Sequence, residues 1–316
     1  MISQLVLLTA VVAALPGPKP VIGGITSSLQ SILKNTHNSK DYGYPTDITR
    51  DLLPIPVHSH NDYWRERPFY TGLSKGCSST EADVWLYNGT LYVGHDQSAL
   101  TPERTLQSLY INPILDILER QNPTSAFITS PTKNGVWDTA PEQTLYFFID
   151  VKTSGRETFQ AVIEALEPLR EKGYLSTVRD GKNLTNGPIT IIGTGDTPLD
   201  MVAPVLDRDY FFDAPLANLN DPIYAAIDGL VSPVASTDFE QAVGKLTVDT
   251  DPILNDDQLR ALRDQIATAK KRGIGARYWN TPYWPVRQRN LVWRTLLREG
   301  VFLLNADDLD AVIAEF

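Results

Sequence analysis

The sequence predicts a (β/α)8 barrel of the TIM type, on three observations. Strand-like and helix-like segments alternate through about seven or eight units over about 260 residues, which suits a closed barrel. Several strands are continuous apolar runs that end in charge, as residues 144–152 do, and this is typical of buried parallel strands. No G-x-G-x-x-G motif follows the first strand, which argues against an open dinucleotide-binding sheet.

Composition limits the classes of partner that the chain can have. It has 316 residues, of which 42% are hydrophobic and 21% charged, as in an ordinary globular protein. The net charge of −10 gives no general attraction to nucleic acid or to anionic membranes, although a local basic pocket is compatible with it. With a single cysteine, Cys77, no internal disulfide can form.

The N-terminus predicts a signal peptide over residues 1–15. The apolar run Leu5–Leu15 is too short to span a bilayer, which takes about 20 residues, but it has the length of a secretory h-region. A retained anchor or an ordinary buried segment is the alternative, because no Lys or Arg precedes the run. The sequons at Asn88 and Asn183 fit a secreted glycoprotein. No later run is long enough for a membrane helix, and we expect localisation in the secretory pathway or outside the cell.

An extended N-terminal arm is expected at residues 16–50, which are rich in Pro, Gly, Ser, Thr and Asn, with the barrel at 51–316. The dipeptide Asn88-Gly89 predicts a tight hairpin, and Pro113 a helix kink. The elements expected in the first half are a strand at 53–58, a helix at 67–75 ended by Gly76, strands at 80–87 and 90–95, and a helix from 101 to 118.

The second half continues the alternation after a polar loop at 122–142. Asn255 is expected to cap a long helix. The expected elements are strands at 144–152, 188–193, 210–212, 229–234, 273–279 and 300–305, and helices at 156–172, 255–272, 285–299 and 306–316.

Candidate site residues gather between His58 and His95, a stretch that holds three of the four histidines. Glu81 and Asp83 stand two apart in a strand, so their side chains share one face and repel unless a cation lies between them. Oxygen ligands of this kind favour Mg²⁺ or Ca²⁺, and nearby histidines can serve as general acid and base.

The barrel brings further polar strand ends to the same place, because barrel active sites lie at the C-terminal ends of the strands. This rule adds Asp150 and Lys152 from a later strand to the candidate site. It also adds Arg277 and Trp279 as candidate substrate contacts. Arg277 suits a phosphate or carboxylate, and Trp279 suits either a substrate contact or packing at the barrel mouth.

These residues stand in strings that resemble a known superfamily. The strings are H-S-H-N-D-Y-W, E-A-D-V-W-L, L-Y-V-G-H-D, F-F-I-D-V-K, I-I-G-T-G-D-T-P, F-F-D-A-P-L, R-Y-W-N-T-P and L-L-N-A-D-D-L, over roughly residues 54–312. Together they resemble the PLC-like phosphodiesterase superfamily, and within it most closely the fungal altered-inheritance-of-mitochondria protein 6 family.

The resemblance implies a metal-dependent phosphodiesterase barrel. By motif, His60 matches the first catalytic histidine and His95 the second, although His58 can also fill the first role. The matching metal ligands are Glu81, Asp83, Asp150 and Asn61, and Lys152 matches a phosphate-binding lysine. The strings G-x-R-G and P-E-N-T, typical of glycerophosphodiesterases, are absent, so the head group of the substrate stays open.

The sequence thus predicts a phosphoric diester hydrolase that uses a divalent metal and histidine acid–base catalysis on a phospholipid or glycerophosphodiester. The alternative is a catalytically silent barrel that keeps the motif and binds phospholipid or metal. A glycoside hydrolase would need a pair of catalytic carboxylates, which histidines around Glu-x-Asp do not suit. We expect no nucleic-acid partner, and the sequence does not specify an oligomeric state.

Overall fold

The computed structural model describes residues 27–36, 48–128 and 130–316, in two compact units, Met1–Tyr44 and Pro45–Phe316. The predicted signal peptide lies outside the described residues. Within the first unit, α1 (Ser27–Asn35) is helical, so the prediction of an extended arm is wrong for these nine residues. Its sequence SSLQSILKN spaces apolar residues three and four apart, which is the pattern of a helix rather than an extended chain.

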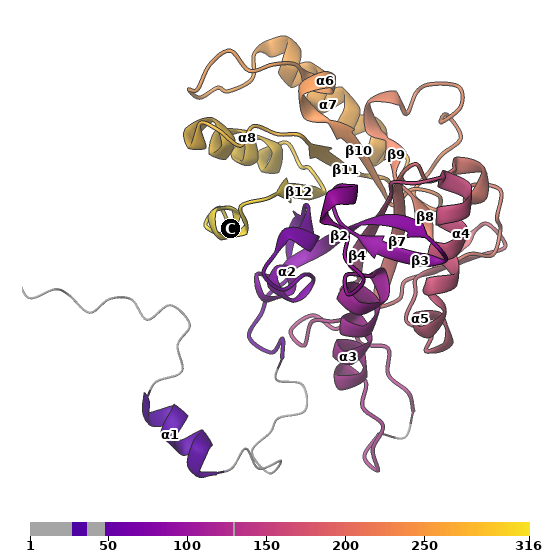
Figure 1. Ribbon diagram of the computed structural model, residues 1–316. Helices are drawn as coiled ribbons and strands as arrows, with labels where there is room; N and C mark the ends of the chain where they lie inside the picture. The colour runs from indigo at the N-terminus through magenta and orange to yellow at the C-terminus, as the bar shows by residue number, and fades with distance from the viewer. Residues whose placement is uncertain (1–26, 37–47, 129) are drawn as a thin grey trace, which may run out of the picture. The chain divides into compact units, whose positions relative to one another are not determined.

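The second unit is built on parallel strands that follow one another side by side in the order β8-β7-β4-β2-β1-β12-β11-β10-β9. Figure 1 shows helices placed around these central strands. The strands are β1 (Ile55–Ser59), β2 (Cys77–Tyr87), β4 (Leu145–Val151), β7 (Ile189–Gly195), β8 (Phe211–Phe212), β9 (Ala214–Pro215), β10 (Val234–Asp238), β11 (Gly275–Trp279) and β12 (Leu303–Ala306).

The strands close into a barrel because β8 and β9 are two halves of one segment, divided only by Asp213. On one side Phe211 pairs in register with Ile192 of β7, and on the other Ala214 pairs with Ala235 of β10. The backbone N–H of Asp213 also donates to the carbonyl of Gly193 at 2.9 Å. Counting β8 and β9 as one, the path has eight members, and the predicted (β/α)8 barrel is confirmed.

Amphipathic helices pack outside the barrel, as buried Ile114, Ile117 and Leu118 do on α3. The helices of this unit are α2 (Tyr70–Ser74), α3 (Asn112–Gln121), α4 (Gly155–Ala165), α5 (Glu167–Glu171), α6 (Phe239–Val243), α7 (Asp256–Lys271), α8 (Val286–Arg298) and α9 (Leu309–Ile313). Among the described residues, no helix is long and apolar enough to cross a membrane.

Three expected elements differ in the structure. The helix expected from residue 101 begins with a π-helical turn at Gln107–Ile111, and Pro113 stands in the first turn of α3, where proline is tolerated, instead of kinking a longer helix. The helix expected at 156–172 is divided into α4 and α5. The strand expected at 229–234 is a turn in which Val231 N donates to Asp228 O, and β10 begins only at Val234.

Two antiparallel strand pairs occur in addition to the parallel strands of the barrel. β3 (Thr90–Val93) returns beside β2 through Asn88 and Gly89, which both have positive φ, so the predicted hairpin is confirmed. β5 (Thr177–Arg179) and β6 (Asn183–Thr185) form a separate hairpin that the sequence did not indicate.

The barrel interior has an apolar half and a polar half. Phe148, Ile192, Phe211, Val234 and Leu303 are buried together in one cluster. Phe148 lies at the boundary between the two halves. The ring of His58 packs against the Phe148 ring edge-on at 4.9 Å, and the Arg277 guanidinium lies 4.9 Å from the centroid of the same ring. The charged side chains of the barrel are therefore concentrated toward the C-terminal ends of the strands, above an apolar floor.

Candidate active site

The strand register places the carboxylates side by side. Asp83 of β2 pairs with Asp150 of β4, and Glu81 stands two residues earlier on the same face as Asp83. One oxygen from each of these three carboxylates lies within 4.8 Å of the other two. Such an arrangement repels itself without a cation and has the donor chemistry that a hard divalent ion prefers.

The three carboxylates differ in the direction in which their surroundings shift their pKa values. Burial together with Glu81 and Asp150 raises the pKa of Asp83 to about 7, and burial also raises that of Asp150. Burial alone would raise the pKa of Glu81, but the neighbouring rings of His60 and His58 and the Arg277 guanidinium hold it well below its usual range. Asp150 Oδ1 is buried without a hydrogen-bond partner among the described residues, so the site has a donor oxygen to spare for a metal ion.

His58, the first of the three histidines, is fully buried in β1. Its Nδ1 lies 2.7 Å from Ser79 Oγ, and its Nε2 lies 3.7 Å from Glu81. Burial and the nearby Arg277 lower its pKa to about 3, so the ring is neutral at physiological pH. This geometry suits a structural contact that supports Glu81.

His60 lies directly after the end of β1, and its ring contacts the carboxylate of Asp307, which follows β12. Its Nδ1 is 2.9 Å from Asp307 Oδ1, which leaves Nε2 facing Glu81 at 3.9 Å. Burial opposes protonation of the ring, but Glu81 and Asp307 outweigh it and raise the pKa of His60 above its ordinary value. Hydrogen bonding through Nδ1 fixes the tautomer and leaves Nε2 available for proton transfer.

The ring of His95 contacts Tyr63, which lies in the same loop after β1 as His60. The Tyr63 hydroxyl lies 2.8 Å from Asp83 Oδ2 and 3.0 Å from His95 Nδ1, and it also contacts Asn61 Oδ1. The ring of Trp64 lies 5.0 Å from that of His95. Tyr63 therefore positions the second histidine beside the carboxylates.

Asn61 adopts a left-handed conformation, with φ of 49°, where the chain turns out of β1. Asparagine tolerates this conformation better than most residues. Its backbone N–H donates to Glu81 Oε2 at 2.9 Å, and its side-chain amide donates to Asp307 at 3.2 Å. Asn61 thus links the loop after β1 to Glu81 and to Asp307.

Two cations complete the site. Lys152 Nζ lies 2.8 Å from Asp150 and 3.2 Å from Asp83; burial opposes its charge, yet these carboxylates raise its pKa to about 12. Arg277 is buried, donates to Asn305 Oδ1 at 2.8 Å and lies 3.8 Å from Glu81. Both cations can hold an anionic group.

Nine of the ten predicted site residues, all except His58, line a cavity of about 440 Å³. Its lining residues are His60, Asn61, Glu81, Asp83, His95, Asp150, Lys152, Thr194, Gly195, Arg277, Trp279 and Asn280. A larger cavity of about 590 Å³, lined by Tyr146, Thr190 and Gly275 among others, lies at the opposite strand ends and has no histidine.

Several residues of the site were missed by sequence reasoning. Gly195 has a φ of +63°, and a Cβ there would stand 2.0 Å from Asp150 Oδ1, so only glycine leaves room for that carboxylate. The signal for it was the string I-I-G-T-G-D at the end of a strand. No sequence signal distinguished Tyr63 from a loop aromatic, because its role depends on closure of the barrel.

Comparisons with known proteins come from solved structures and from relatives in sequence. A glycerophosphodiester phosphodiesterase of Parabacteroides distasonis is similar at a TM-score of 0.43 and 12% identity, over 84% of this chain and 98% of that one. A phosphatidylinositol-specific phospholipase C of Listeria monocytogenes is similar at 0.43 and 11%, over 84% of this chain and 94% of that one.

The sequence relatives are closer. An altered inheritance of mitochondria protein 6 homolog of Arthroderma benhamiae is 51% identical over 93% of this chain and 94% of its own length. Altered inheritance of mitochondria protein 6 of Eremothecium gossypii is 36% identical over 84% of this chain and 70% of its own. The AIM6-like phosphodiesterase domain matches residues 46–213, which carry β1 to β8 and most of the site. The chain therefore belongs to the altered inheritance of mitochondria protein 6 family.

Proposed function

We propose that this protein is a phosphoric diester hydrolase that uses a divalent metal, Mg²⁺ or Ca²⁺, and acts on a phospholipid or glycerophosphodiester. The observation that carries the proposal is the convergence, around one cavity at the C-terminal ends of the barrel strands, of two histidines, three carboxylates, the buried Arg277 and the half-buried Lys152. Phosphodiester cleavage needs these parts: groups that move a proton on each side of the phosphorus, and positive charge for the phosphoryl oxygens.

Glu81, Asp83 and Asp150 would hold the metal, with Asn61 as a further oxygen donor close to them. The spare oxygen of Asp150 and the mutual distances of the three carboxylates fit such an ion. When bound, a divalent ion neutralises charge that builds on the phosphoryl oxygens.

His60 and His95 divide the proton transfer between them. We assign His60 as the base, because Asp307 on Nδ1 stabilises the imidazolium that forms when Nε2 takes a proton. The nucleophile that loses this proton is water or a hydroxyl of the substrate. His95, with its Nδ1 directed at Tyr63, would protonate the leaving oxygen through Nε2.

Lys152 and Arg277 would hold the phosphate. Lys152 offers a point charge, and Arg277 a planar fork that Asn305 keeps in place. Trp279, at the edge of the cavity, would contact the part of the substrate beyond the phosphate.

A catalytically silent barrel is the second candidate, and one contact favours it. Lys152 Nζ already lies between Asp83 and Asp150, where it neutralises part of their charge. A protein that had lost turnover could keep this arrangement and bind phospholipid.

The test is a panel of phosphodiesters, including phosphatidylinositol, lysophosphatidylcholine and glycerophosphocholine, offered to the purified full chain with Mg²⁺ or Ca²⁺. We expect turnover that EDTA abolishes, and a loss of about 10²–10⁴-fold in kcat/KM for His60→Gln and for His95→Gln. No turnover on any member of the panel would favour the silent barrel.

We further propose that the chain enters the secretory pathway and carries glycans. The sequon residues Asn88 and Asn183 are both exposed, and each lies in or beside a surface hairpin. Glycosidase treatment of the protein from its native cells should shift its mass, and the double variant Asn88→Gln/Asn183→Gln should not shift.

A further inference from the structure

Large aromatic side chains are exposed in the segment that follows β11. Tyr283 is 84% and Trp284 69% exposed, and Val286 beside them is also exposed. A second exposed tryptophan, Trp64, lies in the loop that follows β1. Exposed single hydrophobics are ordinary, but adjacent aromatics need an explanation.

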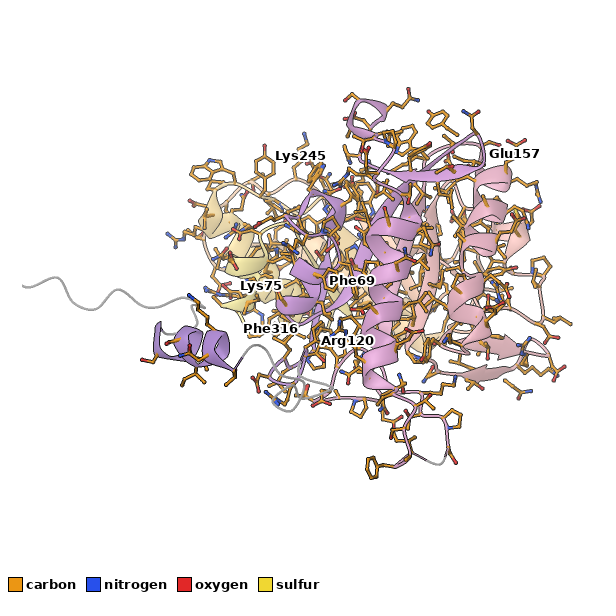
Figure 2. The ribbon with its side chains drawn as sticks, turned by 60° about the horizontal axis from the view of Figure 1, so that its bottom comes forward. Phe69, Lys75, Arg120, Glu157, Lys245 and Phe316 are labelled. Atoms are coloured by element: carbon orange, nitrogen blue, oxygen red, sulfur yellow. The ribbon has the colours of Figure 1, made fainter. Side chains whose placement is uncertain are left out.

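These aromatics lie around the mouth of the candidate active site. The ring of Trp64 is 5.0 Å from that of His95. On the other side, Asn280 lines both the site cavity and a neighbouring groove of about 350 Å³, whose walls include Tyr283 and Trp284. Lys245, at the edge of the molecule in Figure 2, lines the same groove. Trp64 and the pair Tyr283–Trp284 therefore both lie next to residues that line the site cavity.

The local charge of this segment is opposite to that of the whole protein. Residues 280–298 carry four arginines and no acidic residue, in a chain of net charge −10. Arg289, Arg294 and Arg298 each pair with a carboxylate elsewhere in the barrel. Arg287 is exposed and has no ion-pair partner among the described residues. Glu240 lines the same groove, but it pairs with Lys245 at 3.1 Å, so the two charges offset one another. Because charge is screened within about 8 Å at physiological salt, an anionic surface that touches this segment is attracted chiefly by Arg287.

We propose that Trp64, Tyr283, Trp284, Val286 and Arg287, here called the mouth patch, dock the protein on an anionic lipid bilayer. Trp and Tyr favour the head-group region, where the ring is buried and its polar atom stays hydrated. An adjacent arginine adds attraction to anionic lipids. The inference rests on the proposed function in one respect: docking would bring a lipid phosphodiester to the cavity opening.

The test is sedimentation of the full chain with vesicles of phosphatidylcholine alone, or of phosphatidylcholine with phosphatidylserine. We expect Tyr283→Ala/Trp284→Ala to lower partition onto the mixed vesicles by about tenfold or more. Arg287→Gln should lower it by about fivefold on mixed vesicles and leave partition onto phosphatidylcholine alone unchanged. Phe127→Ala is the matched control, since Phe127 is 94% exposed in the loop between α3 and β4, far from the mouth patch along the chain.

Three results would overturn the docking proposal: no partition of the wild type onto either vesicle, unchanged partition of the double variant, or an equal loss in Phe127→Ala. Unchanged vesicle partition of the double variant would leave the mouth patch for a protein partner. The readout needs no turnover, so the two proposals can fail separately. Docking with no hydrolysis of any phosphodiester contradicts the proposed function alone, and hydrolysis without partition contradicts docking alone.

Discussion

Asp307 is the residue that adjusts the proton affinity of His60. Its carboxylate accepts from the ring at 2.9 Å and, with Glu81, raises the pKa of His60 above its ordinary value. A base must be unprotonated to act, so this pKa sets the acidic limb of the pH–rate profile. In Asp307→Asn the amide oxygen can still accept from Nδ1, but the negative charge is gone.

We therefore expect the acidic limb of kcat/KM for Asp307→Asn to move to lower pH, with a loss of about tenfold or more on the plateau. The matched control is Asp310→Asn, which removes an exposed carboxylate from the same end of the chain. A purely structural role for Asp307 would lower activity at all pH values without moving the limb.

Gly195 decides whether Asp150 can occupy the site. In Gly195→Ala the new Cβ would stand 2.0 Å from Asp150 Oδ1, so the carboxylate must move. Gly300→Ala is the matched control, because Gly300 also has a positive φ, +84°, but nothing lies within 4 Å of its Cβ.

Both alanine variants should lose about 1–2 kcal/mol of unfolding free energy from the left-handed backbone. Only Gly195→Ala should also weaken binding of Mg²⁺ or Ca²⁺, measured by calorimetry. Equal metal binding in the two variants would show that Asp150 is not a ligand.

At the scale of elements, the prediction was most accurate where the hydrophobic pattern was strong. The apolar run around Phe147 and the hairpin at Asn88-Gly89 are where the sequence placed them. The error at 229–234 has a physical cause: apolar Leu230 and Val231 look like a strand, but the Asp228 side chain accepts from Leu230 N and starts a turn. A side chain that competes in this way for a backbone N–H cannot be recognised from the spacing of apolar residues.

The cap of α7 gives a prediction for a single element. Asn255 Oδ1 accepts from the backbone N–H of Asp257 and Gln258, and the Gln258 side chain accepts from Asn255 N at 3.1 Å. Asn255→Ala should lower the free energy of unfolding in urea by about 1 kcal/mol. Asp264→Ala, in the exposed middle of the same helix, is the control and should not destabilise, since alanine favours helices. An equal loss in both variants would remove the cap as the cause.

At the scale of the molecule, barrel closure is what turns separate motifs into a site. The sequence could predict that the ends of β1, β2, β4 and β11 carry chemistry, because the C-terminal ends of barrel strands converge. It could not predict that His58 is enclosed while His60 faces the cavity, since both stand in one short string. It also could not predict that Asp307, 247 residues from His60, orients it. These contacts depend on three-dimensional register, which periodicity does not encode.

Closure also assembles a repulsive group of carboxylates, so we expect the stability of the whole barrel to depend on pH and on a divalent metal. The pKa of Asp83 is about 7 in the folded protein, because of burial, Glu81 and Asp150, against about 3.9 for an unfolded aspartate. Between these values the Asp83 carboxyl binds more protons in the folded than in the unfolded state, so without metal its contribution to stability should fall as pH rises from about 4 to about 7. His60, with its raised pKa, acts in the same direction at higher pH, whereas the lowered pKa of Glu81 acts at more acidic pH. His58, whose pKa is lowered to about 3, acts in the opposite direction over the same range, so the contribution of Asp83 is read from the difference between the wild type and a variant at this aspartate.

The measurement is the urea midpoint of the full chain in EDTA across this pH range. Asp83→Asn should gain stability relative to the wild type as pH rises from about 4 to about 7 and be the more stable of the two at pH 7, because the repulsion is gone. Mg²⁺ or Ca²⁺ at pH 7 should raise the wild-type midpoint, since an ion that binds only the folded state stabilises it, and should leave Asp83→Asn nearly unchanged. A metal-free difference in midpoint between Asp83→Asn and the wild type that stays constant from about pH 4 to about pH 7 would contradict the raised pKa of Asp83, and a variant stabilised by metal as strongly as the wild type would remove Asp83 from the ligand set.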